Sequence, residues 1–412
     1  MLQRYLALPL LVRKTVQTDV IRSIIEGPIV AGSQSLALLI LLKGSLQSRA
    51  EGMHADMLQA VLFGGSFLGM MLSLAVLQGA ARFRISKRWM MAGPSFASSA
   101  SIFLAIIFYM RPIAFSVCLG LGFLFLALRL PVLTSIYHEI YPIDKRGRLT
   151  SISFMAYQLS TVIFYYFAGE LLDRGMEYAP WLMGLWGLAA FLSGLVSLQL
   201  PTSERLETTF KAGKAFLLPF IDKWFGYVLL VWFVFGFANL WIYPLRVKYA
   251  VAELDLKPST ISLVLGVIPE MTRLMFLPFW AYLFDRINFI LLRMILNFFL
   301  ALGIGVLFFS STATGVGVGA FIHAVGFSGG KLAWSLWITK TVSKTRSAEY
   351  MAVHVFFTGA RGAFGPMLGA LVLGFLGSYG HAYRNISMLS IFMILLSILM
   401  MIPILKDVSK EP

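Results

Sequence analysis

The sequence predicts an all-α membrane protein with twelve transmembrane helices in two six-helix bundles. Of its 412 residues, 58% are hydrophobic and 13% are charged, which is about half the charged fraction of a soluble protein. Apolar stretches of about 20 residues, the length needed to cross a bilayer, recur along the whole chain. A charged connector divides these stretches into two sets of six. The composition therefore excludes soluble multidomain enzymes.

The twelve predicted spans leave little sequence for a soluble domain. The first is preceded by residues 1–14, where Pro9 interrupts a short apolar run and Arg13 and Lys14 follow without a cleavage site, so we expect an interfacial segment rather than a signal peptide. The spans are placed at residues 16–42, 57–79, 90–110, 113–137, 149–171, 178–200, 224–245, 259–284, 288–309, 313–339, 349–376 and 382–405.

The longest connector, residues 201–223, is rich in charge and is bounded by Pro201 and Pro219. It predicts an N-terminal bundle over residues 1–200, a cytoplasmic central loop over residues 201–223 and a C-terminal bundle over residues 224–412. We expect the chain to be a monomer in the lipid bilayer.

The distribution of Lys and Arg predicts the orientation. Of the 34 basic residues, 21 fall in the termini and loops on one side of the predicted spans and 8 fall on the other side, with Arg293 and Arg384, near the starts of their spans, counted with the adjoining loops. Because positive residues accumulate on the cytoplasmic side, we expect a multi-pass cell-membrane protein with both termini in the cytoplasm. This topology also explains the net charge of +15, so nucleic-acid binding is not expected.

Metal and cofactor chemistry is not expected. The single Cys118 and five isolated histidines offer no ligand cluster. We find no nucleotide-binding loop and no catalytic triad. The sequence therefore predicts neither an enzyme nor a cofactor.

The two halves of the chain repeat each other. When the second half of the sequence is aligned with the first at an offset of 202 residues, Lys331 aligns with Arg129 and Leu332 with Leu130. Parallel repeats of this kind imply a pseudo-twofold axis along the membrane normal, with a site between the halves.

Local motifs give a family resemblance. The turn after the second span begins at Gly79 and holds a basic cluster, although Phe83 stands where an acidic residue is expected, and a second copy keeps Asp285 and Arg286. With the loop after the fourth span, these motifs make the chain resemble the major facilitator superfamily. The resemblance implies secondary transport by alternating access and assigns to the gating loops Gly79, Arg82, Arg84, Arg88, Asp285, Arg286, Arg146 and Arg148.

Ionisable residues inside the spans are the candidates for function, because a charge there costs at least about 2.5–3.5 kcal/mol. Asp19, Arg22 and Glu26 lie on one face of the first span, and Glu270 and Arg273 are three residues apart in the eighth. We predict proton coupling through Glu26 or Glu270, with Asp19 as a further candidate. The alternative is that both groups are ion pairs that fix helix packing.

Three further cations, Arg129, Lys331 and Arg361, have no partner on their own helix. Five positive charges against three negative ones predict a cationic cavity and therefore an anionic organic solute. The expected substrate-binding residues are Arg129, Lys331, Arg22, Arg273 and Arg361, with Arg129 and Lys331 holding one anion between the halves. His323 and His354 are more typical of hydrogen-bonded core residues than of proton relays.

The predicted function is proton-coupled secondary transport of a small anionic solute. One alternative is multidrug-type efflux of amphipathic compounds, because 35 Phe and 9 Trp residues could line an apolar cavity. Another, from a different class, is a transporter-like receptor or scaffold that moves no solute.

Overall fold

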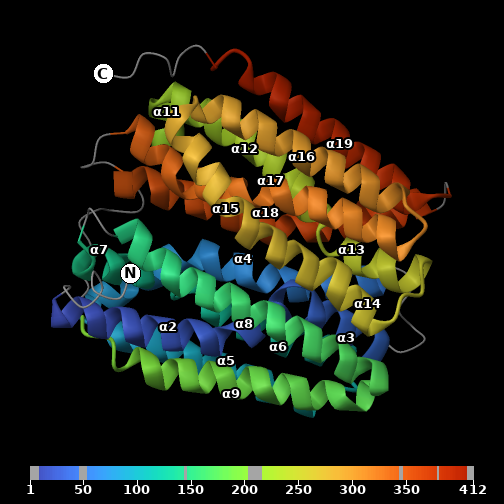
Figure 1. Ribbon diagram of the computed structural model, residues 1–412, viewed down its shortest axis with the longest axis horizontal. Coiled ribbons are helices and arrows are strands. Elements are labelled where there is room, and N and C mark those ends of the chain that lie inside the picture. Colours follow the sequence, from blue (N-terminus) through green and yellow to red (C-terminus); the bar gives the residue numbers. More distant parts are fainter. Residues whose placement is uncertain are drawn as a thin grey trace.

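The computed structural model describes residues 9–45, 53–142, 146–202, 216–342, 347–377 and 380–405, and within these ranges the chain is helical without a strand. Ten helical runs among these residues are long and apolar enough to cross a membrane. Two more long helices, α8 (Arg146–Arg174) and α17 (Ala313–Thr341), have 29 residues each, or about 43 Å of helix. They run alongside the others (Figure 1), and the predicted all-α fold is confirmed.

The N-terminal half forms the lower bundle in Figure 1. Its first span combines α2, a π-helical turn over Gly32–Leu36, α3 and a second π turn over Leu41–Ser45; its fourth span combines α6 and α7. The helices of this half are α2 (Leu10–Ala31), α3 (Ala37–Ile40), α4 (Met53–Arg82), α5 (Lys87–Ile107), α6 (Pro112–Ala127), α7 (Leu130–Ile140), α8 and α9 (Ala179–Ser197), with a 3₁₀ turn over Met176–Tyr178.

The C-terminal half forms the upper bundle (Figure 1). Most of the predicted central loop, residues 203–215, lies outside the described residues. The helices of this half are α11 (Leu218–Ile221), α12 (Lys223–Ile242), α13 (Leu245–Lys248), α14 (Pro258–Ser262), α15 (Ile268–Arg286), α16 (Phe289–Phe309), α17, α18 (Ser347–Leu376) and α19 (Ala382–Met401), with π turns over Tyr249–Glu253 and Leu263–Val267.

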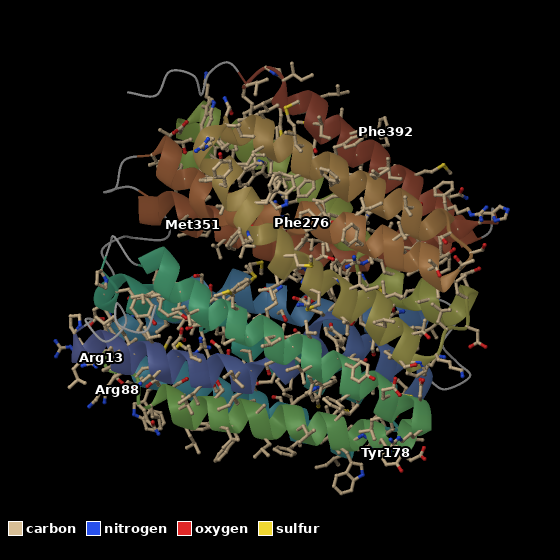
Figure 2. All side chains as sticks on the ribbon, in the orientation of Figure 1. Arg13, Arg88, Tyr178, Phe276, Met351 and Phe392 are labelled. Carbon is tan, nitrogen blue, oxygen red and sulfur yellow. The ribbon has the colours of Figure 1, made fainter. Side chains whose placement is uncertain are left out.

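The long helices run between two ends of the molecule. We call the end where α2 begins and α19 ends the terminal face, and the opposite end the far face. Figure 2 shows Arg13, Arg88 and Met351 toward the terminal face and Tyr178 at the far face.

Pro28 explains a close contact between α2 and α8. Pro28 has no N–H to donate to the carbonyl of Ile24, and the Ser160 hydroxyl of α8 donates to that carbonyl instead, at 2.7 Å. A Cβ at Gly27 would lie 2.4 Å from Ser160 Oγ, so glycine is required for this approach. The pair Pro28 and Gly27 therefore locks α2 onto α8.

Pro131 interrupts the fourth span. Because it cannot donate to the carbonyl of Ala127, α6 ends there and α7 restarts at Leu130. Arg129 occupies the break, at the N-cap position of α7, and its side chain makes no capping hydrogen bond. Its side chain consequently leaves the backbone at a kink inside the bundle.

Packing differs between the two faces. Toward the far face, one apolar core joins both halves, with Leu240, Val247 and Ile261 packed among residues of the N-terminal bundle. Toward the terminal face, the described core residues form two separate clusters, one around Met91 and the other around Trp337. The halves are therefore closed at the far face and packed separately at the terminal face.

Several helix limits differ from the sequence-based expectation. The first span starts at Leu10, so Arg13 lies within helix rather than in an interfacial segment. The seventh span continues beyond Pro244 through α13, which buries Arg246 and Lys248 in the bundle. The assignment of these two cations to an external loop was therefore wrong; Lys248 instead pairs with Asp56 of the other half at 2.5 Å.

Candidate substrate site

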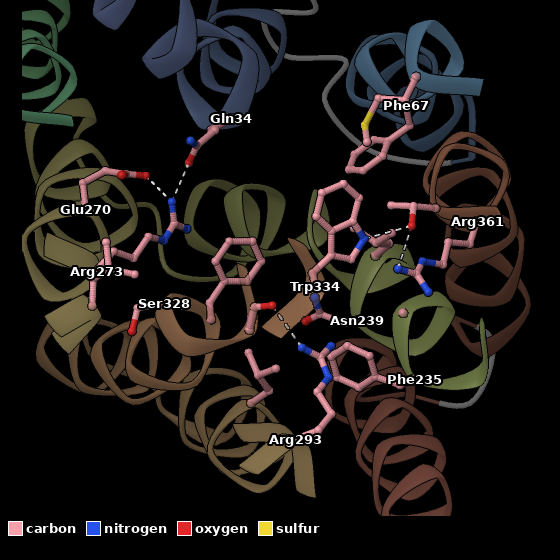
Figure 3. A pocket seen from close by; sticks show the side chains of 18 of the residues that line it. Gln34, Phe67, Phe235, Asn239, Glu270, Arg273, Arg293, Ser328, Trp334 and Arg361 are labelled. Atoms are coloured by element: carbon pink, nitrogen blue, oxygen red, sulfur yellow. Dashed lines mark hydrogen bonds and ion pairs between the residues drawn. The ribbon is translucent and has the colours of Figure 1, made fainter. Parts of the chain in front are cut away.

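A cavity of about 440 Å³ lies between the two halves, at the middle of the helices (Figure 3). Its N-terminal wall comes from the first span, α4 and α8, and its C-terminal wall comes from α12 and α15 to α18. This volume falls in the range of small-molecule sites. Its aromatic lining residues are Phe67, Phe154, Tyr157, Phe235, Phe327 and Trp334.

Among the described residues, one carboxylate faces this cavity, that of Glu270, and it is paired. Arg273 donates to Glu270 on the preceding turn of α15 and reaches Gln34 Oε1 at 3.4 Å. Gln158 on α8 donates its side-chain amide to Glu270 Oε2 at 2.8 Å. The Glu270–Arg273 pair therefore lies at the junction of the two halves.

Two further guanidinium groups line the cavity, those of Arg293 on α16 and Arg361 on α18 (Figure 3). Their exposed fractions are 5% and 6%. Arg293 donates to the Gly330 carbonyl at 3.2 Å, and Arg361 donates to the Trp232 carbonyl at 2.5 Å. Within the described part of the chain, neither has a carboxylate at ion-pair distance.

The surroundings of Arg361 hold it in place. A Cβ at Gly236 would lie 2.5 Å from Arg361 Nε, so glycine lets the guanidinium rest against α12. The Thr358 hydroxyl accepts from Arg361 Nη2 and from Trp334 Nε1, both at 3.1 Å. Arg361 and the indole of Trp334 are thereby fixed relative to each other.

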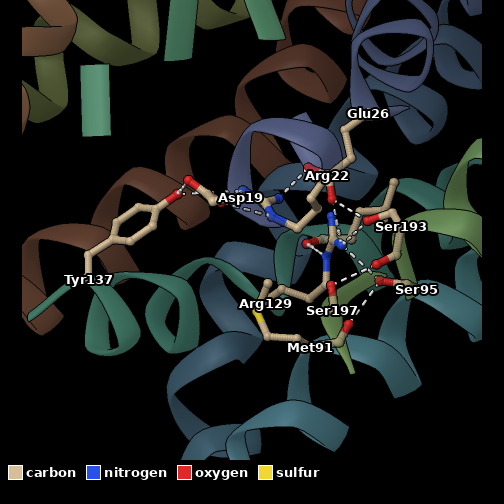
Figure 4. A network of polar contacts seen from close by, with 10 residues as sticks. Asp19, Arg22, Glu26, Met91, Ser95, Arg129, Tyr137, Ser193 and Ser197 are labelled. Carbon is tan, nitrogen blue, oxygen red and sulfur yellow. Dashed lines mark hydrogen bonds and ion pairs between the residues drawn. The ribbon is translucent and has the colours of Figure 1, made fainter. Parts of the chain in front are cut away.

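The N-terminal half contains a separate network of charges (Figure 4). Arg22 contacts Asp19 and Glu26, both at 2.6 Å, and Arg129 contacts Glu26 at 2.8 Å. The Tyr137 hydroxyl donates to Asp19 at 2.7 Å. Two carboxylates therefore face two guanidiniums, and the network is formally neutral.

Serine side chains complete this network. Arg129 donates to Ser95 Oγ at 2.8 Å and to Ser193 Oγ at 3.0 Å, and the Ser193 hydroxyl donates to Glu26. These contacts connect α2, α5, α9 and the break before α7. The kink at Pro131 is what brings the Arg129 side chain to them.

A second cavity, of about 350 Å³, is lined by Arg22, Glu26 and Arg129. It shares Phe154 and Tyr157 of α8 with the central cavity. Tyr137, near the end of α7 at the terminal face, also lines it.

Among the described residues, Arg129 has no ion-pair partner on its own helix, as the sequence indicates, and pairs with Glu26 on another helix. It also lines the second cavity rather than the central one. The side chain of Lys331 lies outside the described residues, although its neighbour Gly330 lines the central cavity. The anion clamp of Arg129 and Lys331 therefore stays a prediction.

Sequence reasoning missed Arg293, which the count of basic residues had placed in a cytoplasmic loop. The signal was its position inside the apolar run 289–309, four residues after the start of α16. His323 and His354 are both buried, and His323 Nε2 lies 3.0 Å from Asn239 Oδ1.

The loop motifs lie near the terminal face. Arg82, Arg84 and Arg88 have exposed side chains around the turn between α4 and α5, and Arg286 stacks on the Tyr282 ring at 4.1 Å. Lys87 in the same turn pairs with Glu139 at 2.6 Å. The side chains of Asp285, Arg146 and Arg148 lie outside the described residues.

In the described part of the chain, the ten apolar runs together with α8 and α17 surround a central cavity between two halves, which is the arrangement of a multi-pass membrane transporter. The family model for the Major Facilitator Superfamily matches residues 30–364. The chain belongs to this superfamily, and it is a transporter of small molecules rather than an enzyme.

Solved structures agree with this fold. The nucleoside transporter NupG is 14% identical, with a TM-score of 0.69 over 98% of this chain and 100% of that one. A D-xylose-proton symporter is 13% identical, with a TM-score of 0.72 over 94% and 97%. A bacterial homologue of the human lysosomal transporter Spinster is 13% identical, with a TM-score of 0.66 over 97% of both chains. The search of curated proteins returned no match.

Proposed function

We propose that this protein is a secondary transporter of a small organic anion, which binds in the central cavity. The observation that carries the proposal is the charge of the described residues on its wall: three guanidiniums, those of Arg273, Arg293 and Arg361, against one carboxylate, that of Glu270. A buried cation without a counter-ion is costly in a low-dielectric interior. An anionic solute supplies that counter-ion.

The same wall argues against the multidrug alternative. Its aromatic side chains would accept an amphipathic body, but a lipophilic cation would face a cavity with a formal charge of +2. We therefore expect anionic compounds to compete for the site and cationic ones to be excluded.

The direction of access follows from packing. The halves share a core toward the far face and have separate cores toward the terminal face. With both termini in the cytoplasm, as the distribution of basic residues predicts, this arrangement corresponds to access from inside. Alternating access then requires the far-face contacts to break and terminal-face contacts to form.

Labelling tests this orientation. In a Cys118→Ala background, a cysteine at exposed position 88 should react with an impermeant reagent only after the membrane is permeabilised. A cysteine at position 181, an exposed residue of α9 near the far face, should react in intact cells. The reverse pattern would show that the proposed orientation is wrong.

Proton coupling is proposed to use Glu270. Its carboxylate faces the central cavity and accepts from Gln158 of the other half. Protonation of Glu270 would weaken both its ion pair with Arg273 and its contact with Gln158 of the other half. Proton binding would thereby be linked to the movement of the halves, as coupling requires. Glu26 has two guanidinium partners in a network away from the central cavity, and we give it the second place.

Transport in proteoliposomes tests the function. The purified protein should accumulate a radiolabelled organic anion when an inward proton gradient is imposed, and unlabelled anions should compete with it. Competition by lipophilic cations alone would contradict the proposal and would favour multidrug efflux.

A further inference from the structure

The charges of the central cavity carry a conclusion about the solute, which rests on the proposed function. Glu270 neutralises Arg273 on the adjacent turn. Arg293 and Arg361 then remain, with a formal charge of +2 and no carboxylate partner in the described ranges. The solute must therefore offset two positive charges rather than one.

Both guanidiniums also retain hydrogen-bonding capacity. A guanidinium has five N–H donors. In Arg293 and in Arg361 the Nε atom is buried without an acceptor among the described residues, while the Nη atoms donate to two neutral carbonyls and one hydroxyl. Neutral oxygens satisfy part of the donors but leave the net charges in place.

The two cations are close enough to share a neighbour. The Trp232 carbonyl accepts from Arg361, and the Trp232 ring lies 5.3 Å from the guanidinium carbon of Arg293. The Phe235 ring lies 4.5 Å from the same carbon. Burying two like charges around one turn of α12 is unfavourable, and a monoanion would leave one of them uncompensated.

The rest of the lining indicates the body of the solute. Aromatic rings from both halves, including those of Phe67, Phe154 and Trp334, surround the polar groups. A cavity of about 440 Å³ with this lining suits one small apolar or planar group.

We infer that the transported solute is a dianion: a small apolar or aromatic body carrying two negative charges, as in a dicarboxylate or a phosphate monoester, held by Arg293 and Arg361. Both chemistries provide charge near −2 at neutral pH. They differ in whether the two charges are on separate carboxylates or on one group.

Four probes with one benzene ring test the inference: isophthalate, phenyl phosphate, benzoate and benzamide. Binding to the purified full-length protein is measured by intrinsic tryptophan fluorescence, with isothermal calorimetry as a second readout. We expect at least one dianion to bind about 30-fold more tightly than benzoate, and benzamide to bind least. The stronger of the two dianions identifies the chemistry of the charged group.

Variants test which residues bind the second negative charge of the solute. Arg293→Gln and Arg361→Gln should each reduce the affinity for the preferred dianion to near that of benzoate, with a smaller change for benzoate itself. Arg384→Gln is the matched control, because it removes one positive charge at an exposed position on α19. It should leave all four affinities unchanged.

The outcomes separate this inference from the proposed function. If benzoate binds as tightly as both dianions and more tightly than benzamide, the dianion inference is overturned while anion transport stands. If benzamide equals the three anions, both are overturned. The series on the unaltered protein decides this even if a variant fails to fold.

Discussion

Two sets of buried arginines, one in each half of the transporter, have different partners. In the N-terminal half, Arg22 and Arg129 meet the carboxylates of Asp19 and Glu26 at 2.6–2.8 Å. In the C-terminal half, Arg293 and Arg361 meet carbonyls, aromatic rings and a hydroxyl. The first set has no net charge, as expected of residues that hold helices together. The second set keeps its positive charge, which a ligand can offset. Burial by itself therefore does not distinguish a structural arginine from a binding one; the partner does.

The largest expected effect comes from breaking the neutral network. Glu26→Gln should destabilise the protein by about 3–5 kcal/mol, because it leaves Arg22 and Arg129 with one carboxylate between them. Arg361→Gln should leave stability unchanged or raise it, since it removes a buried charge without a carboxylate partner. Thermal unfolding in detergent measures both.

A double variant sharpens this comparison. Adding Arg129→Gln to Glu26→Gln should restore part of the lost stability, because the charges balance again. Equal melting temperatures for Glu26→Gln and the unaltered protein would show that the network is not a brace.

The next effect concerns coupling at the junction of the halves. Glu270→Gln should abolish proton-driven accumulation but preserve exchange of labelled for unlabelled solute, because exchange needs no net proton movement. Glu253→Gln, at an exposed far-face position, is the control. Wild-type accumulation by Glu270→Gln would exclude Glu270 as the proton carrier.

A moderate effect is expected at the far-face contact between the halves. Asp56→Asn removes the buried partner of Lys248 and should destabilise the state that is closed at this face. A cysteine at position 67 in the central cavity, in a Cys118→Ala background, should then react faster with a reagent applied at the far face. The double variant Asp56→Lys with Lys248→Asp, which exchanges the two charges, should slow the reaction again. Equal reaction rates for the background protein, Asp56→Asn and the double variant would contradict a role of this ion pair in closure.

The smallest effect tests how Arg361 is positioned. Gly236→Ala adds a Cβ that would lie 2.5 Å from Arg361 Nε, and the guanidinium must shift. We expect about 1 kcal/mol of lost binding, or about fivefold weaker affinity for the solute, without a change of charge. Gly184→Ala, where a Cβ would meet nothing within 4 Å, should bind normally.

Much of the fold could be predicted from the sequence because each span must be long and apolar to cross the bilayer. The same rule made the scarce ionisable residues of the spans visible, and six of them lie in the described ion pairs: Asp19, Arg22, Glu26, Arg129, Glu270 and Arg273. The prediction of span limits failed at the helix ends, where a basic residue is assigned to a loop although the helix continues. Arg246, Lys248 and Arg293 were missed for that reason.

Hydropathy and helical periodicity alone determined the membrane location, the helix count and the local pairs Asp19–Arg22 and Glu270–Arg273, because these depend on neighbours along one helix. Which side chains of different helices pair with each other depends on how the helices pack and where they kink. Only the tertiary structure brought Arg129 to Glu26 through the break at Pro131, and only it placed Arg293 beside Arg361 on the cavity wall. The physical reason is that an ion pair needs its atoms within 4 Å, a distance that sequence spacing does not set between separate helices.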